Sequence, residues 1–176
     1  MFVWIDLEMT GLNPEINRIC EIATIITDRE LNIVGEGPNL VIHLEDKHLD
    51  IMDEWCTKHH GESGLTDRIR ESTVTVEKAE QETLKFISDY VGEKEAPLCG
   101  NSIWQDRRFL AKEMPLLESY LHYRCVDVTS IKILSDAWYK KKIVPPQKAM
   151  THRALDDIRE SIYELQFYRE HVFKER

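Results

Sequence analysis

The chain has no apolar run long enough to cross a membrane. A bilayer-spanning helix needs about 20 consecutive apolar residues, whereas the longest obvious candidate here, Ile22–Ile26, has the length of a buried strand. We also expect no removable targeting segment, because an apolar stretch that predicts a strand begins at Phe2. We therefore expect a cytoplasmic protein that does not insert into membranes.

Cysteine and positive charge are both scarce. The four cysteines are isolated, without the paired spacing of zinc or redox motifs, and predict reduced core residues: Cys20, Cys56, Cys99 and Cys125. Lys and Arg number 23 against 32 Asp and Glu, which gives a net charge of -9. A long basic track for duplex nucleic acid is therefore not expected. Short nucleotides remain possible, because bound divalent cations can supply local positive charge.

The overall composition is that of one folded unit. A chain of 176 residues with 42% hydrophobic content can bury one sizeable core. No internal repeat or low-complexity segment marks a boundary. We therefore treat residues 1–176 as a single domain.

The apolar pattern begins with strands. Three segments rich in Ile, Val and Leu, separated by turn sequences, predict a three-stranded meander at residues 2–8, 18–27 and 33–44. Apolar residues then recur three or four positions apart through Leu49, Met52, Trp55 and Cys56, and again from Val76 to Val91. This spacing predicts two helices that pack on the sheet.

The second half of the chain has α/β order. Short strands at residues 97–100 and 124–126 each lead into a helix, at residues 105–114 and 129–138. A loop over residues 139–150 precedes a long helix at about residues 154–173.

Two acidic residues interrupt the first apolar segment. On a strand, Asp6 and Glu8 project to the same face with their stems roughly 7 Å apart, so both can reach one ion. A free carboxylate among apolar neighbours is costly to bury without a cation or hydrogen bonds. Oxygen ligands without Cys or a His pair favour Mg²⁺ or Mn²⁺ over zinc. The alternative is a solvated strand end, because Asp-x-Glu is common in an acidic chain.

A second candidate pair lies near the end of the chain. His152 and Asp157 are five residues apart, roughly 140° around a helix, so they cannot share a helical face. We expect Asp157 to bind metal from a fixed helix while His152, in the preceding loop, reaches a water molecule as general base. The alternative is a surface His followed by an acid that the helix dipole favours.

Asp106 is the third acidic candidate. It follows the predicted strand at residues 97–100, at a strand-to-helix transition where α/β proteins gather ligands. The alternative for Asp106 is a charge at a helix N-terminus.

In this order, Asp6, Glu8, Asp106, His152 and Asp157 resemble the catalytic set of the DEDD 3′ to 5′ exonuclease superfamily, in the subclass with a His ahead of the last Asp. The likeness extends over essentially the entire chain to the oligoribonuclease family. The further similar segments are residues 4–12, 36–39, 63–65, 100–102, 122–124 and 152–161.

This resemblance implies a fold and a reaction. The fold would be α/β, an RNase H-like mixed sheet with the antiparallel meander plus parallel strands, flanked by helices and assembled as a homodimer. The reaction would be hydrolysis of short single-stranded RNA, down to dinucleotides, from the 3′ end to nucleoside 5′-monophosphates.

The resemblance also implies two divalent cations, Mg²⁺ or Mn²⁺, flanking the scissile phosphate. Asp6 would bridge both ions, Glu8 and Asp157 would hold the one that carries the attacking water, and Asp106 would support the other. His152 would take the proton from that water.

Six further residues are implied as substrate contacts. Leu12 would wedge between two bases, Trp55 would stack on a base, and His60 and Ser102 would meet the terminal phosphate. Tyr123, also implied as catalytic, and Arg124 would come from the partner subunit.

Plain alternatives exist for several of these contacts. Leu12 could pack in a turn, Trp55 could belong to a helix core, and Tyr123 could be an ordinary strand aromatic. His60 could be an accidental neighbour of Cys56 and His59. Thr129 stands where relatives often carry Ser, which keeps the hydroxyl and adds a methyl group.

Two other functions compete with this hypothesis. A proofreading or trimming exonuclease would share the catalytic residues but act on longer single strands. A noncatalytic nucleotide-binding module would keep the pocket and lose the metals, which the intact acidic set argues against.

Overall fold

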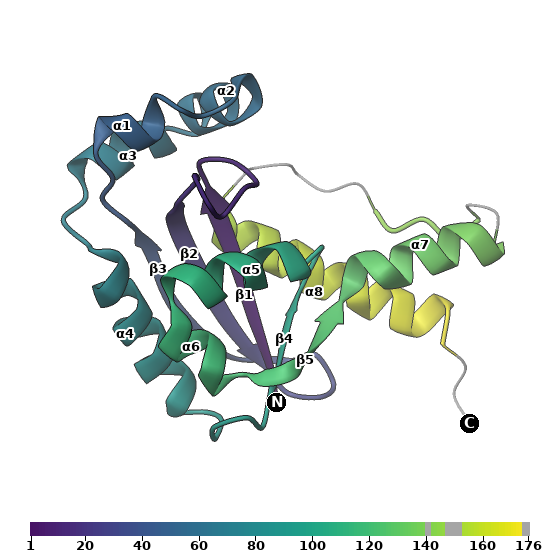
Figure 1. Ribbon diagram of the computed structural model, residues 1–176. Helices are drawn as coiled ribbons and strands as arrows, with labels where there is room; N and C mark the ends of the chain where they lie inside the picture. The colour runs from purple at the N-terminus through teal and green to yellow at the C-terminus, as the bar shows by residue number, and fades with distance from the viewer. Residues whose placement is uncertain (140–141, 147–152, 174–176) are drawn as a thin grey trace.

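The computed structural model describes residues 1–139, 142–146 and 153–173 (Figure 1). Its core is a five-stranded sheet in the order β3-β2-β1-β4-β5. β1, β2 and β3 are antiparallel neighbours, whereas β4 and β5 run parallel to β1. The predicted mixed sheet with its meander is therefore confirmed. The strands are β1 (Phe2–Met9), β2 (Ile19–Thr27), β3 (Ile33–Val41), β4 (Pro97–Gly100) and β5 (His122–Asp127).

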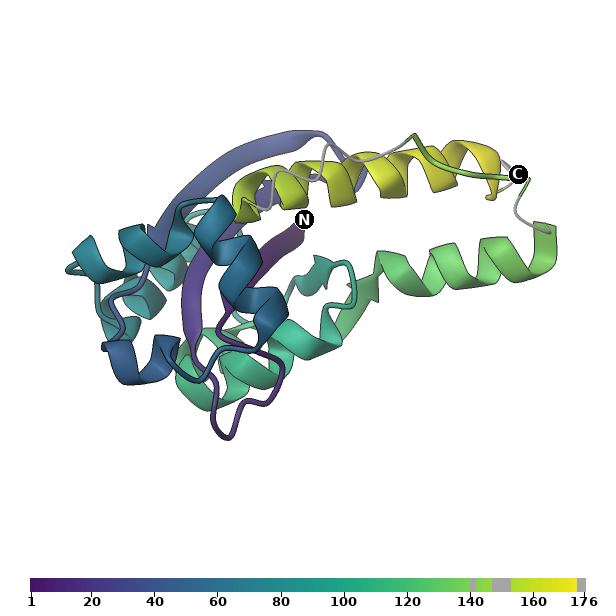
Figure 2. The same ribbon diagram turned by 90° about the horizontal axis from the view of Figure 1, so that it is seen from above.

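Helices cover both faces of the sheet. One face packs against α4 (Val76–Ser88), α5 (Trp104–Glu113) and α6 (Pro115–Tyr120), and the other packs against α8 (Ala154–His171). Figure 2 shows α8 on one side of β1 and α5 on the other. The sheet therefore separates two apolar cores.

The alternation of side chains along β1 assigns each residue to one of these cores. Val3, Ile5 and Leu7 lie in the core under α4, α5 and α6. Trp4 lies in the core under α8, and side chains two apart on a strand share a face. The even-numbered acidic residues of β1 therefore face α8.

The sequence predicted one helix, packed on the sheet, through Leu49, Met52, Trp55 and Cys56. Both its length and its position are wrong. α1 (Asp46–Leu49) ends before a separate helix, α2 (Glu54–Glu62), begins. The side chain of Asp53 accepts a hydrogen bond from the backbone N–H of Cys56 at 2.7 Å and caps this new start. α2 and α3 (Leu65–Glu71) lie beyond the strand ends rather than on a face of the sheet (Figure 1).

Two helices, α3 and α6, were not expected from the sequence. α6 begins with Pro115 in its first turn, where a missing N–H costs nothing. Its next two backbone N–H groups, those of Leu116 and Leu117, donate to Oε1 of the buried Glu80 at 2.7 and 3.1 Å. A side chain of α4 therefore stabilises the start of α6, a contact between distant segments that local patterning does not reveal.

The cysteine prediction holds for three of four residues. Cys20, Cys56 and Cys99 are buried free thiols. Cys125 is also free but exposed, so its assignment to the core is wrong. It lies on β5, which has a neighbouring strand on only one side and whose middle residues face solvent.

The last two long helices extend away from the sheet on the same side of the molecule. α7 (Val128–Tyr139) follows β5 directly, and α8 packs along it and under β1 and β2. Figures 1 and 2 both show α7 and α8 projecting past β5. Within the described ranges, none of the helices has the length and apolar character that crossing a membrane requires.

Candidate active site

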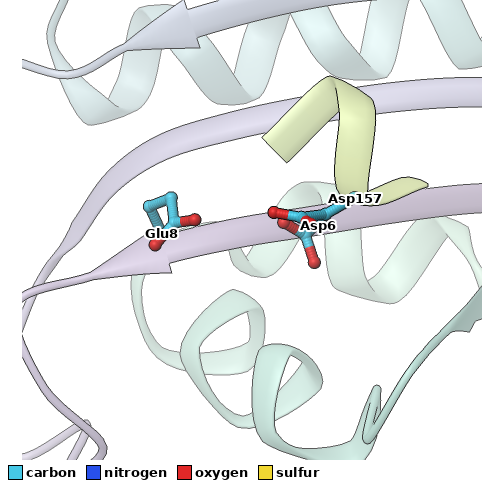
Figure 3. A group of neighbouring side chains, drawn as sticks. All are labelled: Asp6, Glu8 and Asp157. Carbon is cyan, nitrogen blue, oxygen red and sulfur yellow. The ribbon is translucent and has the colours of Figure 1, made fainter. Parts of the chain in front are cut away.

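The structure brings three acidic side chains together across nearly the full length of the chain. Asp6 and Glu8 come from β1, and Asp157 comes from the first turn of α8. One carboxylate oxygen of each lies within 4.8 Å of the others. Figure 3 shows the carboxylate of Asp157 reaching from α8 to that of Asp6. Among the described residues, this is the one group of three or more acidic, His or Cys side chains with ligand spacing.

Asp106 approaches β1 from the opposite helix layer. It lies in the first turn of α5 with 6% of its surface exposed. Its Oδ1 accepts a hydrogen bond from the backbone N–H of Leu7, between Asp6 and Glu8, at 3.0 Å. Asp106 is therefore anchored beside the acidic group, although its oxygens are not within the three-residue cluster.

Burial and mutual repulsion disfavour the charged forms of these carboxyls. Burial, followed by the charges of Asp106, Glu8 and Asp157, raises the pKa of Asp6 well above its ordinary value. Burial and the charge of Asp157 raise the pKa of Glu8 to about 8, and burial raises the pKa of Asp106 to about 7. A divalent cation would reverse this penalty, and an all-oxygen donor set suits Mg²⁺ or Mn²⁺. The residues therefore fit such an ion.

Sequence reasoning missed a further acid, which is fully buried beside this group. Glu21 pairs with Glu8 across β1 and β2 and has no exposed surface. Its Oε1 accepts from Arg68 Nη1 at 3.2 Å, and Oε2 has no hydrogen-bond partner in the described part of the chain. Its charge contributes to the raised pKa of both Asp6 and Glu8. The signal that could have revealed it is an acid inside an otherwise apolar strand, opposite Glu8.

Two of the predicted base contacts are exposed. Leu12, in the loop after β1, exposes 69% of its surface, and Trp55, at the start of α2, exposes 56%. Packing in a turn and membership of a helix core are therefore wrong as alternatives for Leu12 and Trp55. Trp55 stacks on His59, with ring centroids 4.0 Å apart.

His60 lies under this surface rather than on it. Only 3% of its surface is exposed, its Nε2 donates to the carbonyl of Met9 at 2.9 Å, and its Nδ1 lies 4.0 Å from Glu8 Oε2. Burial lowers the pKa of His60, which favours the neutral ring. The side chain therefore connects α2 to the end of β1 beside a predicted metal ligand.

Ser102 lies in a tight turn between β4 and α5. Its φ of 50° is in the left-handed region, and its backbone N–H donates to Asp127 Oδ1 and to Thr129 Oγ1, both at 2.9 Å. The Ser102 hydroxyl donates to the same Thr129 oxygen at 3.2 Å. The hydroxyl of Thr129 is therefore part of the structure that holds this turn.

Within this chain, Tyr123 and Arg124 lie away from the acidic group. Both are on β5, two strands from β1. Tyr123 exposes 73% of its surface, and the guanidinium carbon of Arg124 lies 5.3 Å from the centroid of its ring. His152 lies outside the described residues.

The chain resembles exonucleases in sequence and in fold. The family model RNase_T, described as exonuclease, matches residues 3–165. An oligoribonuclease of Marinobacter nauticus is 55% identical over 172 residues, which covers 98% of this chain and 96% of the relative. An oligoribonuclease of Vibrio cholerae is 56% identical, covering 98% and 95%. The chain belongs to the oligoribonuclease family.

Solved structures of more distant proteins share the fold. Exonuclease I from Methylocaldum szegediense has a TM-score of 0.69 at 20% identity, and the zinc-bound E. coli exonuclease I complex with single-stranded DNA has 0.74 at 16%. Each likeness covers 97% of this chain but only 40% of the other protein. The chain therefore corresponds to less than half of those proteins.

Proposed function

We propose that the protein is a metal-dependent 3′ to 5′ exoribonuclease that hydrolyses very short RNA, down to dinucleotides, to nucleoside 5′-monophosphates. The observation that carries this proposal is the convergence of Asp6, Glu8 and Asp157 within 4.8 Å, in a chain about 55% identical to named oligoribonucleases.

The proposed reaction assigns a role to each residue of the site. Asp6, Glu8 and Asp157 would hold one divalent cation, and Asp106, with Asp6, would hold a second. When bound, Mg²⁺ or Mn²⁺ supplies a nucleophilic water at neutral pH and neutralises charge on the phosphate. His152 would accept a proton from the attacking water. Backbone anchoring of Asp106 through Leu7 at 3.0 Å keeps the two sides of the site in register.

A preference for very short RNA should appear in the dependence of rate on length. If Leu12 and the buried His60 close the end of the binding site, the rate per molecule should be highest for two nucleotides and fall as RNA lengthens to ten. Single-turnover hydrolysis of 5′-labelled RNAs of two to ten nucleotides measures this. A trimming exonuclease would instead hydrolyse the longest RNA fastest. A strong preference for the longest RNA would therefore exclude the proposed activity on very short RNA.

Trp55 offers the clearest test of base stacking. Stacking of a base on an aromatic ring contributes about 1–3 kcal/mol, so Trp55→Ala should weaken dinucleotide binding about tenfold. The melting temperature should change little, because 56% of the Trp55 surface is exposed. Isothermal titration with a dinucleotide in Ca²⁺ buffer measures the affinity.

The matched control is Trp104→Ala on α5, where 58% of the side chain is exposed. This variant should bind the dinucleotide like the unmodified protein. Unchanged affinity in Trp55→Ala would remove Trp55 from the binding site.

We also propose that the protein is a homodimer. Helix α7 leaves much apolar surface exposed, including Ile133, which exposes 61% of its surface, and Trp138, which exposes 68%. Tyr123, on the adjoining strand β5, exposes 73%. A second copy would cover this surface, and it would also bring Tyr123 and Arg124 to a site that their own chain does not reach.

A charge on this surface should break the dimer. Ile133→Glu should shift the sedimentation coefficient from that of a dimer to that of a monomer and lower dinucleotide hydrolysis, because burying a carboxylate in an apolar interface is costly. Leu116→Glu on α6, where 60% of the side chain is exposed, is the matched control and should remain dimeric. If the unmodified protein sediments as a monomer, the homodimer proposal is wrong.

We place this activity in the cytoplasm. The support is the exposed free thiol of Cys125 together with three buried free thiols, since such thiols persist in a reducing compartment.

A further inference from the structure

A chain of hydrogen bonds connects the turn after β4 to the helix that carries Asp157. Asn101 is its centre: Nδ2 donates to Ser161 Oγ at 2.8 Å and to Glu164 Oε2 at 3.3 Å. Oδ1 of Asn101 accepts from the hydroxyl of Thr129 at 3.1 Å. The hydroxyl of Ser161 in turn donates to the backbone carbonyl of Asp157 at 2.8 Å.

The partners define the orientation of the Asn101 amide. Glu164 offers only acceptor oxygens when ionised, so the amide nitrogen must face it. The hydroxyl oxygen of Thr129 already accepts from the backbone N–H of Ser102 at 2.9 Å, and its own proton goes to Asn101 Oδ1. The hydroxyl proton of Ser161 is used on the carbonyl of Asp157, so Ser161 accepts from Asn101. Each group has one consistent role.

These bonds supply what apolar packing of α8 cannot. Ala154, Ile158 and Ile162 bury α8 against the sheet, but burial is non-directional and tolerates small shifts along the helix axis. A hydrogen bond weakens steeply with distance and angle. Ser161 is four residues after Asp157 and therefore on the same helical face. The Asn101 contact thus fixes the position of α8 one turn away from the carboxylate that joins the acidic group.

Water cannot easily replace the amide. Ser161 exposes 6% and Glu164 2% of its surface. Glu164 Oε1 is also close to the hydroxyl of Tyr168, at 3.5 Å, and to Lys132 Nζ, at 3.7 Å. Removal of the Asn101 amide would leave buried polar atoms with one partner fewer, which is costly.

We propose that Asn101 is a positioning residue for the metal-binding carboxylate of Asp157, that it acts through Ser161, and that it thereby sets the affinity for the divalent cation. The inference rests on the proposed function, which makes Asp157 a metal ligand. The role proposed for Asn101 requires no direct contact between its side chain and the cation or the RNA. Groups that hold a metal ligand in place typically change metal affinity about 10- to 100-fold when they are removed.

The test is Mn²⁺ binding without RNA, measured by isothermal titration on the full chain. Asn101→Ala should raise the Mn²⁺ dissociation constant about tenfold, and Ser161→Ala should raise it by a smaller factor. The double variant should bind no more weakly than Asn101→Ala, because both changes break the same route. Asn32→Ala is the matched control: it loses an exposed bond to Asp28, 2.9 Å long, at the other end of the sheet. Its dissociation constant should stay within about twofold of the unmodified value.

A second measurement separates positioning from a general loss of structure. Hydrolysis of a dinucleotide by Asn101→Ala should recover to within about twofold as Mn²⁺ reaches saturation, with an unchanged KM for the dinucleotide. A protein whose fold is damaged would lose kcat at all Mn²⁺ concentrations. If Asn101→Ala does not reach a native fold, Asn101→Ser, which keeps a short polar side chain, undergoes the same two measurements.

The outcomes distinguish this inference from the proposed function. Unchanged Mn²⁺ affinity in Asn101→Ala, or losses that add in the double variant, overturn the positioning role even if the unmodified protein hydrolyses dinucleotides. Weakened Mn²⁺ binding in a protein that hydrolyses no RNA supports the positioning role and removes the proposed activity. An unmodified protein that binds no Mn²⁺ overturns both.

Discussion

Asp106→Asn is expected to lower hydrolysis of a dinucleotide by about a thousandfold or more while the protein keeps its fold. The amide has the same shape as the carboxyl, and its oxygen can still accept the hydrogen bond that Leu7 donates at 3.0 Å. It lacks the charge that a second divalent cation requires. The loss should therefore fall on kcat.

The same substitution should make the metal-free protein more stable above neutral pH. Burial raises the pKa of Asp106 to about 7, so at pH 8 the carboxylate is charged and buried beside other acids. A neutral amide removes this repulsion. Unfolding in EDTA at pH 8 should occur at a higher temperature in Asp106→Asn than in the unmodified protein.

Asp67→Asn on α3 is the matched control, because its side chain is 81% exposed. It should change neither activity nor the melting temperature in EDTA. Full activity in Asp106→Asn would overturn the assignment of this residue to the metal site.

The second large effect is a pH dependence of stability that divalent cations should suppress. Glu8 and Asp106 have ordinary pKa values of 4.5 and 3.8, which burial and neighbouring charge raise to about 8 and about 7 in the folded protein. Between these limits the folded state holds protons that the unfolded state has released. The contribution of these two groups to the stability of the metal-free protein is therefore fully present below about pH 4 and is lost as the pH rises toward 8.

The slope is appreciable. Each group that is protonated in the folded chain and ionised in the unfolded chain contributes at most about 1.4 kcal/mol per pH unit. Urea unfolding in EDTA at several values from pH 5 to 8 measures this fall, and saturating Mn²⁺ should flatten it, because the ion binds the charged carboxylates. Glu8→Gln should flatten the slope in EDTA, whereas Glu62→Gln at the exposed end of α2 should not. Stability that rises with pH in EDTA would contradict the raised pKa values.

Local patterning was sufficient for the strand that carries the first two acids. Asp6 and Glu8 alternate with Ile5 and Leu7, and this two-residue period depends only on the strand itself. Asp157 could be placed at the start of a helix for a similar reason. Their convergence follows once α8 covers the face of β1 that bears the acids.

The parts that escaped sequence reasoning depend on contacts between distant segments. Glu21 looks like one polar residue in an apolar strand until its pairing with Glu8 is known. The role of Asn101 depends on its hydrogen bond to Ser161, 60 positions later in the chain. The spacing of Leu49, Met52, Trp55 and Cys56 suits one helix, but the side chain of Asp53 caps a separate start and leaves Trp55 exposed.

The two-sided character of β1 also links correct folding to competence for chemistry. If the register of β1 against β2 shifted by one residue, Ile5 and Leu7 would turn toward α8. Asp6 and Glu8 would then point into the hydrophobic core beneath α5. Such a misaligned chain would lose its core and its ion-binding face in a single error. A chain that folds stably therefore also assembles the acidic site. A misfolded form that is stable but inactive is disfavoured.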